Sequence, residues 1–99
     1  MIKQIINWNV SNGRDFSSMF RFADVSNIDF NNWDVSNGRD FSNMFEFANA
    51  SNIDLSNWDV SNGTNFSEMF GSAKNFTGET LENWNVSNGA NFHQMFSYC

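Results

Sequence analysis

One unit of about 25 residues recurs four times along this chain, and this repeat restricts the folds open to it more than any other feature. Its tryptophans are Trp8, Trp33, Trp58 and Trp84, and glycines follow at Gly13, Gly38, Gly63 and Gly89. Met-Phe pairs close the units at Met19-Phe20, Met44-Phe45, Met69-Phe70 and Met95-Phe96. Such a period is typical of repeat architectures, in which each unit packs mainly on its neighbours.

Two apolar periods follow each other within every unit. Around each tryptophan, apolar and polar residues alternate, which predicts short half-buried strands over 8–11, 33–36, 58–61 and 84–87. An Asn-Gly pair then indicates a turn. After it, the apolar residues from Phe16 to Ala23 are spaced i, i+3, i+4 and i+7, which predicts a short helix with Asp15 as its N-cap.

These elements predict an α/β fold, namely a leucine-rich-repeat-like solenoid of about four 25-residue strand-turn-helix repeats with a short parallel sheet. The segment from Leu55 to Gly63 has the L-x-x-L-x-L-x-x-N spacing of leucine-rich repeats, with Trp, Val and Gly as substitutes. We expect a single repeat domain over 1–99, with units near 1–23, 24–48, 49–73 and 74–99.

The pattern N-W-D-V-S-N-G-x-[DN]-F-S-x-M-F-x-x-A resembles a bacterial surface-protein repeat of about 26 residues. That repeat is found in mycoplasma-type lipoproteins and is grouped with BspA-like leucine-rich repeats. The resemblance implies a right-handed leucine-rich-repeat-like solenoid on a cell-surface or secreted protein, with adhesion or protein interaction as its role and no catalytic residues. The family usually carries Val where this chain has the repeated Gly, which suggests a tighter turn or a group packed closely against the backbone.

The charge balance excludes several classes of partner. With a formal net charge of −6 and a pI near 4.3, the chain is a poor ligand for phosphate backbones and anionic membrane surfaces. We therefore expect no nucleic acid among its partners. No apolar stretch approaches the length of a membrane span, and the N-terminal residues are too few for a signal peptide, so we expect no membrane insertion. The sequence indicates no cofactor.

Polar residues recur at fixed strand positions and would form columns across a parallel sheet. One column is Asn9, Asp34, Asp59 and Asn85, a second contains Ser36 and Ser61, and Asn32 and Asn57 lie beside them. This face is the candidate binding surface, as in other repeat proteins. It is open to three interpretations: a ligand groove, a divalent-cation site at Asp34 and Asp59, or a ladder of side chains that hydrogen-bond only to one another. No metal-loop motif is present, so no metal site is assigned.

The other candidates for chemistry point away from catalysis. The tryptophans share the inward parity of the valines two residues later, which predicts core packing and makes carbohydrate binding the weaker alternative. His93 and Cys99 are the only His and Cys residues, and on one helix they would point to different faces. We expect a protein that is not an enzyme, because every reactive group is single or belongs to a repeated column.

The apolar pattern continues to both ends of the chain without the atypical capping units that repeat proteins usually carry. The first functional hypothesis is a protein-protein interaction or adhesion module. The alternative is a structural protein that self-assembles through its uncapped ends into a dimer or fibre. The stretch between Gly71 and Asn83, which contains one extra residue, is a further candidate contact surface.

Overall fold

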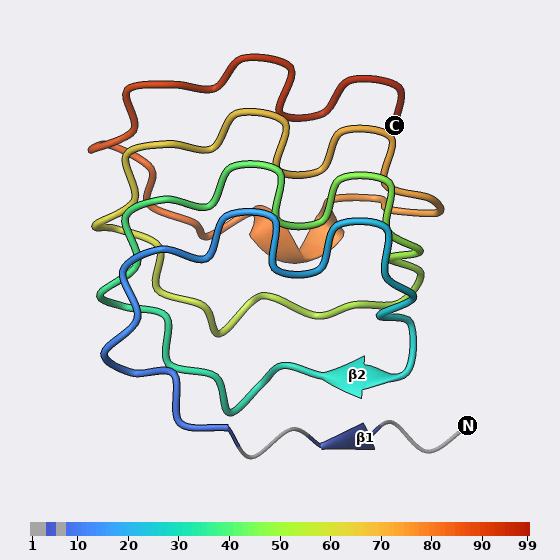
Figure 1. The fold of residues 1–99 in the computed structure, drawn as a ribbon, viewed down its shortest axis with the longest axis horizontal. Helices are drawn as coiled ribbons and strands as arrows, with labels where there is room; N and C mark the ends of the chain where they lie inside the picture. Colours follow the sequence, from blue (N-terminus) through green and yellow to red (C-terminus); the bar gives the residue numbers. More distant parts are fainter. Residues whose placement is uncertain (1–3, 6–7) are drawn as a thin grey trace.

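The chain winds into four coils that lie one above another, each beginning at a tryptophan (Figure 1). The computed structural model describes residues 4–5 and 8–99. We call coils 1 to 4 the stretches 8–32, 33–57, 58–83 and 84–99. The radius of gyration is 12.3 Å, close to the roughly 13 Å of a compact domain of this length.

Regular secondary structure is nearly absent from the described residues. β1 (Gln4–Ile5) pairs in parallel with β2 (Ile28–Asp29), with Gln4 opposite Ile28, and η1 (Glu79–Leu81) is a single 3-10 turn. Elsewhere, isolated parallel bridges join equivalent residues of neighbouring coils, such as Asp15 and Asp40. The coils are therefore stacked in register without forming an extended sheet.

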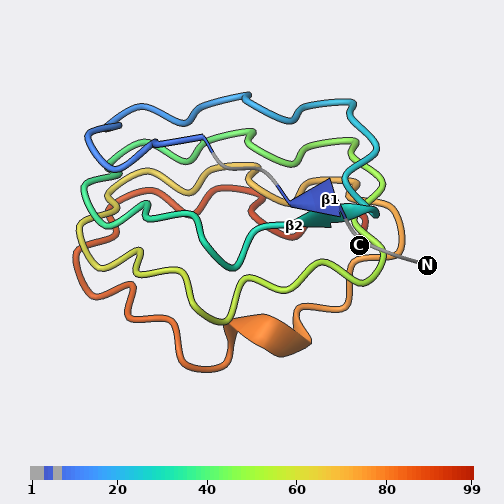
Figure 2. The same cartoon turned by 90° about the horizontal axis from the view of Figure 1, so that it is seen from below.

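Two walls face each other across the core, as the view from below shows (Figure 2). The Phe walls are the stretches 14–24, 39–49, 64–74 and 90–99, and the Trp walls are 28–36, 53–61 and 79–87. One cluster of buried apolar side chains fills the space between them.

The backbone of each Phe wall is a zigzag of tight turns, not the predicted helix. Alternate N–H groups of coil 1 donate to carbonyls of coil 2, as Phe16 does to Asp40 at 2.8 Å. The N–H groups between them donate three residues back, as Ala23 does to Phe20 at 3.0 Å. Every fourth residue has positive φ, including Phe22 at 63°, which ends any helix because a helix needs negative φ throughout.

The prediction of an α/β, leucine-rich-repeat-like solenoid of strand-turn-helix units with a parallel sheet is therefore wrong. The strands expected around the tryptophans are also missing, because those segments form turns in which Gly38 N–H donates to the Val35 carbonyl at 2.8 Å. The zigzag repeats every four residues and buries the same positions as a helix would. The apolar spacing thus predicted the inward side chains correctly but not the backbone hydrogen bonds.

The repeated glycine meets a need for space. A Cβ atom on Gly63 would lie 2.4 Å from Cζ of Phe66 and 3.0 Å from the Val60 carbonyl oxygen, and the equivalent glycines have similar neighbours. None of these four glycines has positive φ. Of the two explanations suggested by the sequence, the close approach of a neighbouring group is confirmed.

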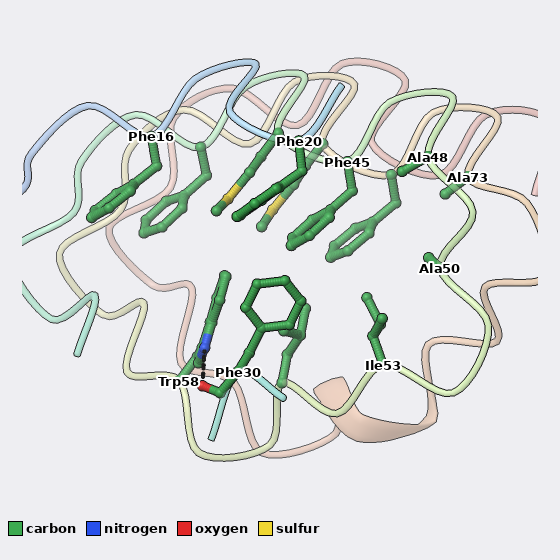
Figure 3. Packing of buried hydrophobic residues seen from close by; sticks show 14 of the residues in the cluster. Phe16, Phe20, Phe30, Phe45, Ala48, Ala50, Ile53, Trp58 and Ala73 are labelled. Atoms are coloured by element: carbon green, nitrogen blue, oxygen red, sulfur yellow. Dashed lines mark hydrogen bonds between the residues drawn. The ribbon is translucent and has the colours of Figure 1, made fainter. Parts of the chain in front are cut away.

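Stacked aromatic columns run through the core (Figure 3). Phe45 stacks on Phe20 and on Phe70, with ring centroids 5.7 and 5.6 Å apart. From the Trp wall, Phe30 meets Phe45 edge-on, and the Trp58 indole N–H donates to the Phe30 carbonyl at 3.2 Å. The prediction that the tryptophans pack in the core is right for the two interior ones and in part for Trp84, which is half-buried, and wrong for Trp8, which is exposed.

Candidate functional site

The predicted polar column exists, but it lies on turns instead of a sheet. Its members, Asn9, Asp34, Asp59 and Asn85, are exposed, and each Oδ1 accepts the N–H of the serine two residues later at 3.0–3.1 Å. The hydroxyl and N–H of Ser36 hold the pKa of Asp34 below its ordinary value, and Ser61 does the same for Asp59. These side chains therefore close Asx turns within their own coils, a structural role that differs from all three interpretations of the sequence.

A second polar ladder runs beside this column and was missed by the sequence reasoning. The side-chain amides of Asn37, Asn62 and Asn88 donate to the carbonyls of Ser11, Ser36 and Ser61 in the preceding coil at 2.7–2.8 Å. The predicted residues Asn32 and Asn57 are exposed, and the Asn57 amide reaches the Asn31 oxygen only at 3.4 Å. The recurrence of Asn before each Gly is the signal that could have revealed the ladder.

The cation interpretation gains no support from the arrangement of carboxylates. The Asp34 charge opposes the lowering of the Asp59 pKa, so the two groups are close enough to interact, yet each is already bonded to its own serine. Across residues 4–5 and 8–99, no group of three or more His, Cys, Asp or Glu side chains could hold a metal ion.

The irregular stretch of coil 3 borders a hollow of about 550 Å³. Residues 75–80 form one side of it and residues 50–54 the other. Gly78 has φ of 75° and leads into η1, so the extra residue is accommodated by a turn that the other coils lack. The Thr80 hydroxyl accepts the Leu55 N–H at 3.2 Å and fixes this turn to coil 2.

The largest exposed apolar side chains gather on the first and last coils. Among the described residues there are seven, of which three belong to coil 1 and three to coil 4: Trp8, Met19, Phe22, Phe92, Phe96 and Tyr98. The seventh, Phe47, lies in coil 2. We call the end of the stack formed by coil 1 the N-face and the end formed by coil 4 the C-face.

The C-face also contains an apolar hollow of about 220 Å³. Its lining is entirely apolar: Leu81, Trp84, Val86, Phe92, Met95 and Phe96. Between neighbouring interior coils the equivalent positions are filled, since Phe41, Met44 and Phe45 are fully buried. The hollow is thus the place where a further layer of side chains would pack.

Backbone polar groups at the two end faces are complementary. Each coil donates four N–H groups from its Phe wall to the next coil, so those of coil 4 have no partner among the described residues: Phe92, Gln94, Phe96 and Tyr98. Coil 1 correspondingly leaves four carbonyls without a donor in the described part of the chain: Asp15, Ser17, Met19 and Arg21. Along this middle stretch of the wall the C-face presents donors and the N-face acceptors, whereas at the ends of the wall the direction reverses, as where Asp40 N–H donates to the Arg14 carbonyl.

An exposed aromatic pair lies at one corner of coils 1 and 2. Phe22 and Phe47 stack with centroids 4.9 Å apart, and the Arg21 guanidinium lies over both rings while pairing with Glu46 at 2.7 Å. Both phenylalanines have positive φ, at 63° and 57°. The pair is held by contacts within the protein, because one face of each ring lies against the other ring.

His93 and Cys99 each hydrogen-bond to other residues. The His93 backbone N–H donates to the Asn91 side chain, and the Cys99 thiol donates to the Phe70 carbonyl at 3.0 Å. Desolvation raises the pKa of the Cys99 thiol, which lowers its thiolate fraction at neutral pH. No helix in the described part of the chain is long and apolar enough to cross a membrane.

A family of Mycoplasma proteins of unknown function, DUF285, matches residues 1–99. The chain belongs to this family. The resemblance to a mycoplasma repeat family is thereby confirmed, whereas its grouping with leucine-rich repeats is not. Neither a curated protein nor a solved structure shows a significant match.

Proposed function

We propose that this protein is a non-enzymatic interaction module that binds protein through the end faces of its coil stack. The observation in favour is that six of the seven large exposed apolar side chains among the described residues belong to coils 1 and 4. Exposed apolar patches of this kind mark interaction sites when polar residues surround them. Adhesion at a cell surface, as the sequence resemblance implies, is one setting in which such a module would act.

The absence of catalysis in this proposal is supported by how the reactive groups are used. The exposed carboxylates of the polar column serve as acceptors in Asx turns, and the Cys99 thiol is bonded to a carbonyl. An active site needs mixed reactive groups that converge on one place with free access to substrate. The hollow at residues 75–80 is where the coil regularity of the described residues is broken, and its lining contains neither His, Cys, Lys nor Arg.

Partner classes other than protein have less in their favour. The net charge of −6 opposes nucleic acid and anionic membranes. Carbohydrate binding by the corner pair is opposed by the stacking of Phe22 on Phe47 and by the Arg21 guanidinium, which lies over both rings. Self-assembly through the uncapped ends is the alternative within the protein class.

The proposal is tested by retention on immobilised proteins: fibronectin, fibrinogen, serum albumin and the chain itself. Phe96→Asp places a charge on the C-face, and Phe47→Asp is the matched control, because it changes an equally exposed Phe in an interior coil. We expect at least one immobilised protein to retain the wild type and Phe47→Asp about tenfold more strongly than Phe96→Asp. Equal retention of all three, or none on any surface, would overturn the proposal.

A further inference from the structure

We infer that the partner of the C-face is the N-face of a second copy of this chain, stacked head to tail in the register of the internal coils. This inference rests on the proposed function and names its partner. The protein itself contains this interface three times, because coils 1 and 2, 2 and 3, and 3 and 4 are joined in the same way. When the same interface is repeated between coil 4 of one copy and coil 1 of the next, it determines which atoms of the two copies meet.

Backbone hydrogen bonds define the register. Phe66 N–H donates to the Asn91 carbonyl and Phe70 N–H to the Met95 carbonyl, and equivalent bonds join the other coils. One step further along the stack, Phe92 N–H meets the Asp15 carbonyl of the second copy. Gln94, Phe96 and Tyr98 follow with the carbonyls of its Ser17, Met19 and Arg21. Four donors and four acceptors that lack partners among the described residues thus meet with the same spacing along the wall.

The exposed apolar side chains fall into the same register. In the tryptophan column, Trp8 contacts Trp33 at 6.1 Å and Trp33 contacts Trp58 at 6.3 Å, so Trp8 of the second copy comes next to Trp84. In the corner column, Tyr98 comes next to Phe22 of the second copy, as Phe47 does within one chain. These contacts cover four of the apolar side chains of the two end coils.

Charge favours this pairing over contacts between other faces. Coil 4 contains no Asp, Glu, Lys or Arg, in a chain whose net charge is −6. The Phe wall of coil 1, residues 14–24, carries Arg14 and Arg21 against Asp15 and Asp24, a net charge of zero. The two end faces therefore meet without the repulsion that two acidic surfaces would experience.

The polarity of these two central rows disfavours a symmetric dimer through either face. Two C-faces would oppose donor rows to donor rows, and two N-faces would oppose acceptors to acceptors. A head-to-tail contact leaves one free face at each end of the pair and so continues into linear oligomers. The average mass should therefore rise steadily with concentration instead of stopping at a dimer.

Two single substitutions test the orientation. Tyr98→Asp blocks the C-face and should not unfold the protein, because Tyr98 is 91% exposed, while Met19→Asp blocks the N-face. Phe47→Asp is again the control. Each blocked variant should associate about tenfold more weakly than the wild type in sedimentation equilibrium. The key measurement is the mixture, which should form one-to-one dimers because each variant keeps the face that the other has lost.

Each outcome decides between the models. A wild type that stays monomeric overturns the inference, as does a single blocked variant that dimerises alone or a mixture that forms no dimer. If another immobilised protein retains the wild type but not Phe96→Asp while self-association is absent, the proposed function survives and this inference fails. If retention and self-association are both absent, both fail. Thermal unfolding followed by tryptophan fluorescence shows whether each variant remains folded.

Discussion

Interior and end coils carry the same side chains in opposite environments. Phe66 in coil 3 is fully buried, whereas Phe92 in the same column of coil 4 is 41% exposed. Trp33 is 3% exposed and Trp8 is 61% exposed. The repeat thus determines which side chains form each column, but burial comes from the coil above and the coil below. A unit of this kind has little stability without neighbours.

The largest test of this comparison is truncation of one phenylalanine column. Phe66→Ala removes a ring packed between Phe41 and Phe92, and we expect a loss of about 3–5 kcal/mol in unfolding free energy. Phe92→Ala should cost only about 1–2 kcal/mol, because its ring is stacked on one side only and remains partly in water. Urea unfolding measures both. Equal losses would show that coil 4 is covered in solution or that coil 3 is less packed.

The repeated glycine gives a second, smaller contrast. Gly63→Ala places a Cβ against the buried Phe66 ring, which cannot move, so a loss of about 1–3 kcal/mol is expected. Gly89→Ala meets the Phe92 ring, which is free to turn toward solvent, and should cost less than about 1 kcal/mol. Denaturant midpoints of the two variants provide the comparison. A larger loss at Gly89 would contradict this account.

The sequence predicts the buried positions of this fold but not its backbone conformation. The spacing from Phe16 to Ala23, which recurs in the next two units, correctly identified the buried positions of the interior Phe walls, because residues four apart share a face in both a helix and the zigzag. It could not distinguish the two backbones. The difference lies in positive φ at Ser18 and Phe22, residue types that give no sign of it.

The candidate site was predictable to a similar extent. The column through Asp34 and Asp59 was found, since it follows from the repeat, but its role in Asx turns depends on the serine two residues later. The D-x-S spacing was visible in the sequence and was interpreted as strand alternation. The exposed end faces were expected from the missing capping units, whereas the separation into donor and acceptor faces required the backbone.

The amide ladder provides a smaller difference in stability between interior and end coils. Asn62→Ala removes a hydrogen bond of 2.8 Å to the Ser36 carbonyl, and because the group is exposed we expect a loss of about 0.5–1 kcal/mol. Asn12→Ala should be nearly silent, because the Asn12 amide has no preceding coil to reach within the described residues. Thermal melts of both variants test this. A cost at Asn12 as large as that at Asn62 would show an unrecognised partner.

The last difference between interior and end coils concerns stability at acidic pH. Interior coils carry Asp34 and Asp59 in the column where the end coils carry Asn9 and Asn85. The Ser36 and Ser61 hydrogen bonds lower both Asp pKa values below 3.8 in the folded state, so their stabilising contribution is present above that pH. It is lost as the pH falls through the folded-state pKa values.

Replacing both residues, as Asp34→Asn with Asp59→Asn, should leave stability at neutral pH nearly unchanged, because Asn9 shows that an amide oxygen accepts the same serine bonds. Below pH 3.8, urea unfolding should show a shallower fall in stability for the double variant than for the wild type. A slope remains from Asp15 and Asp24, whose pKa values are also lowered by serine bonds. Identical acid profiles would mean that the interior carboxylates are as easily protonated as in the unfolded chain, and that Asp and Asn are equivalent in this column.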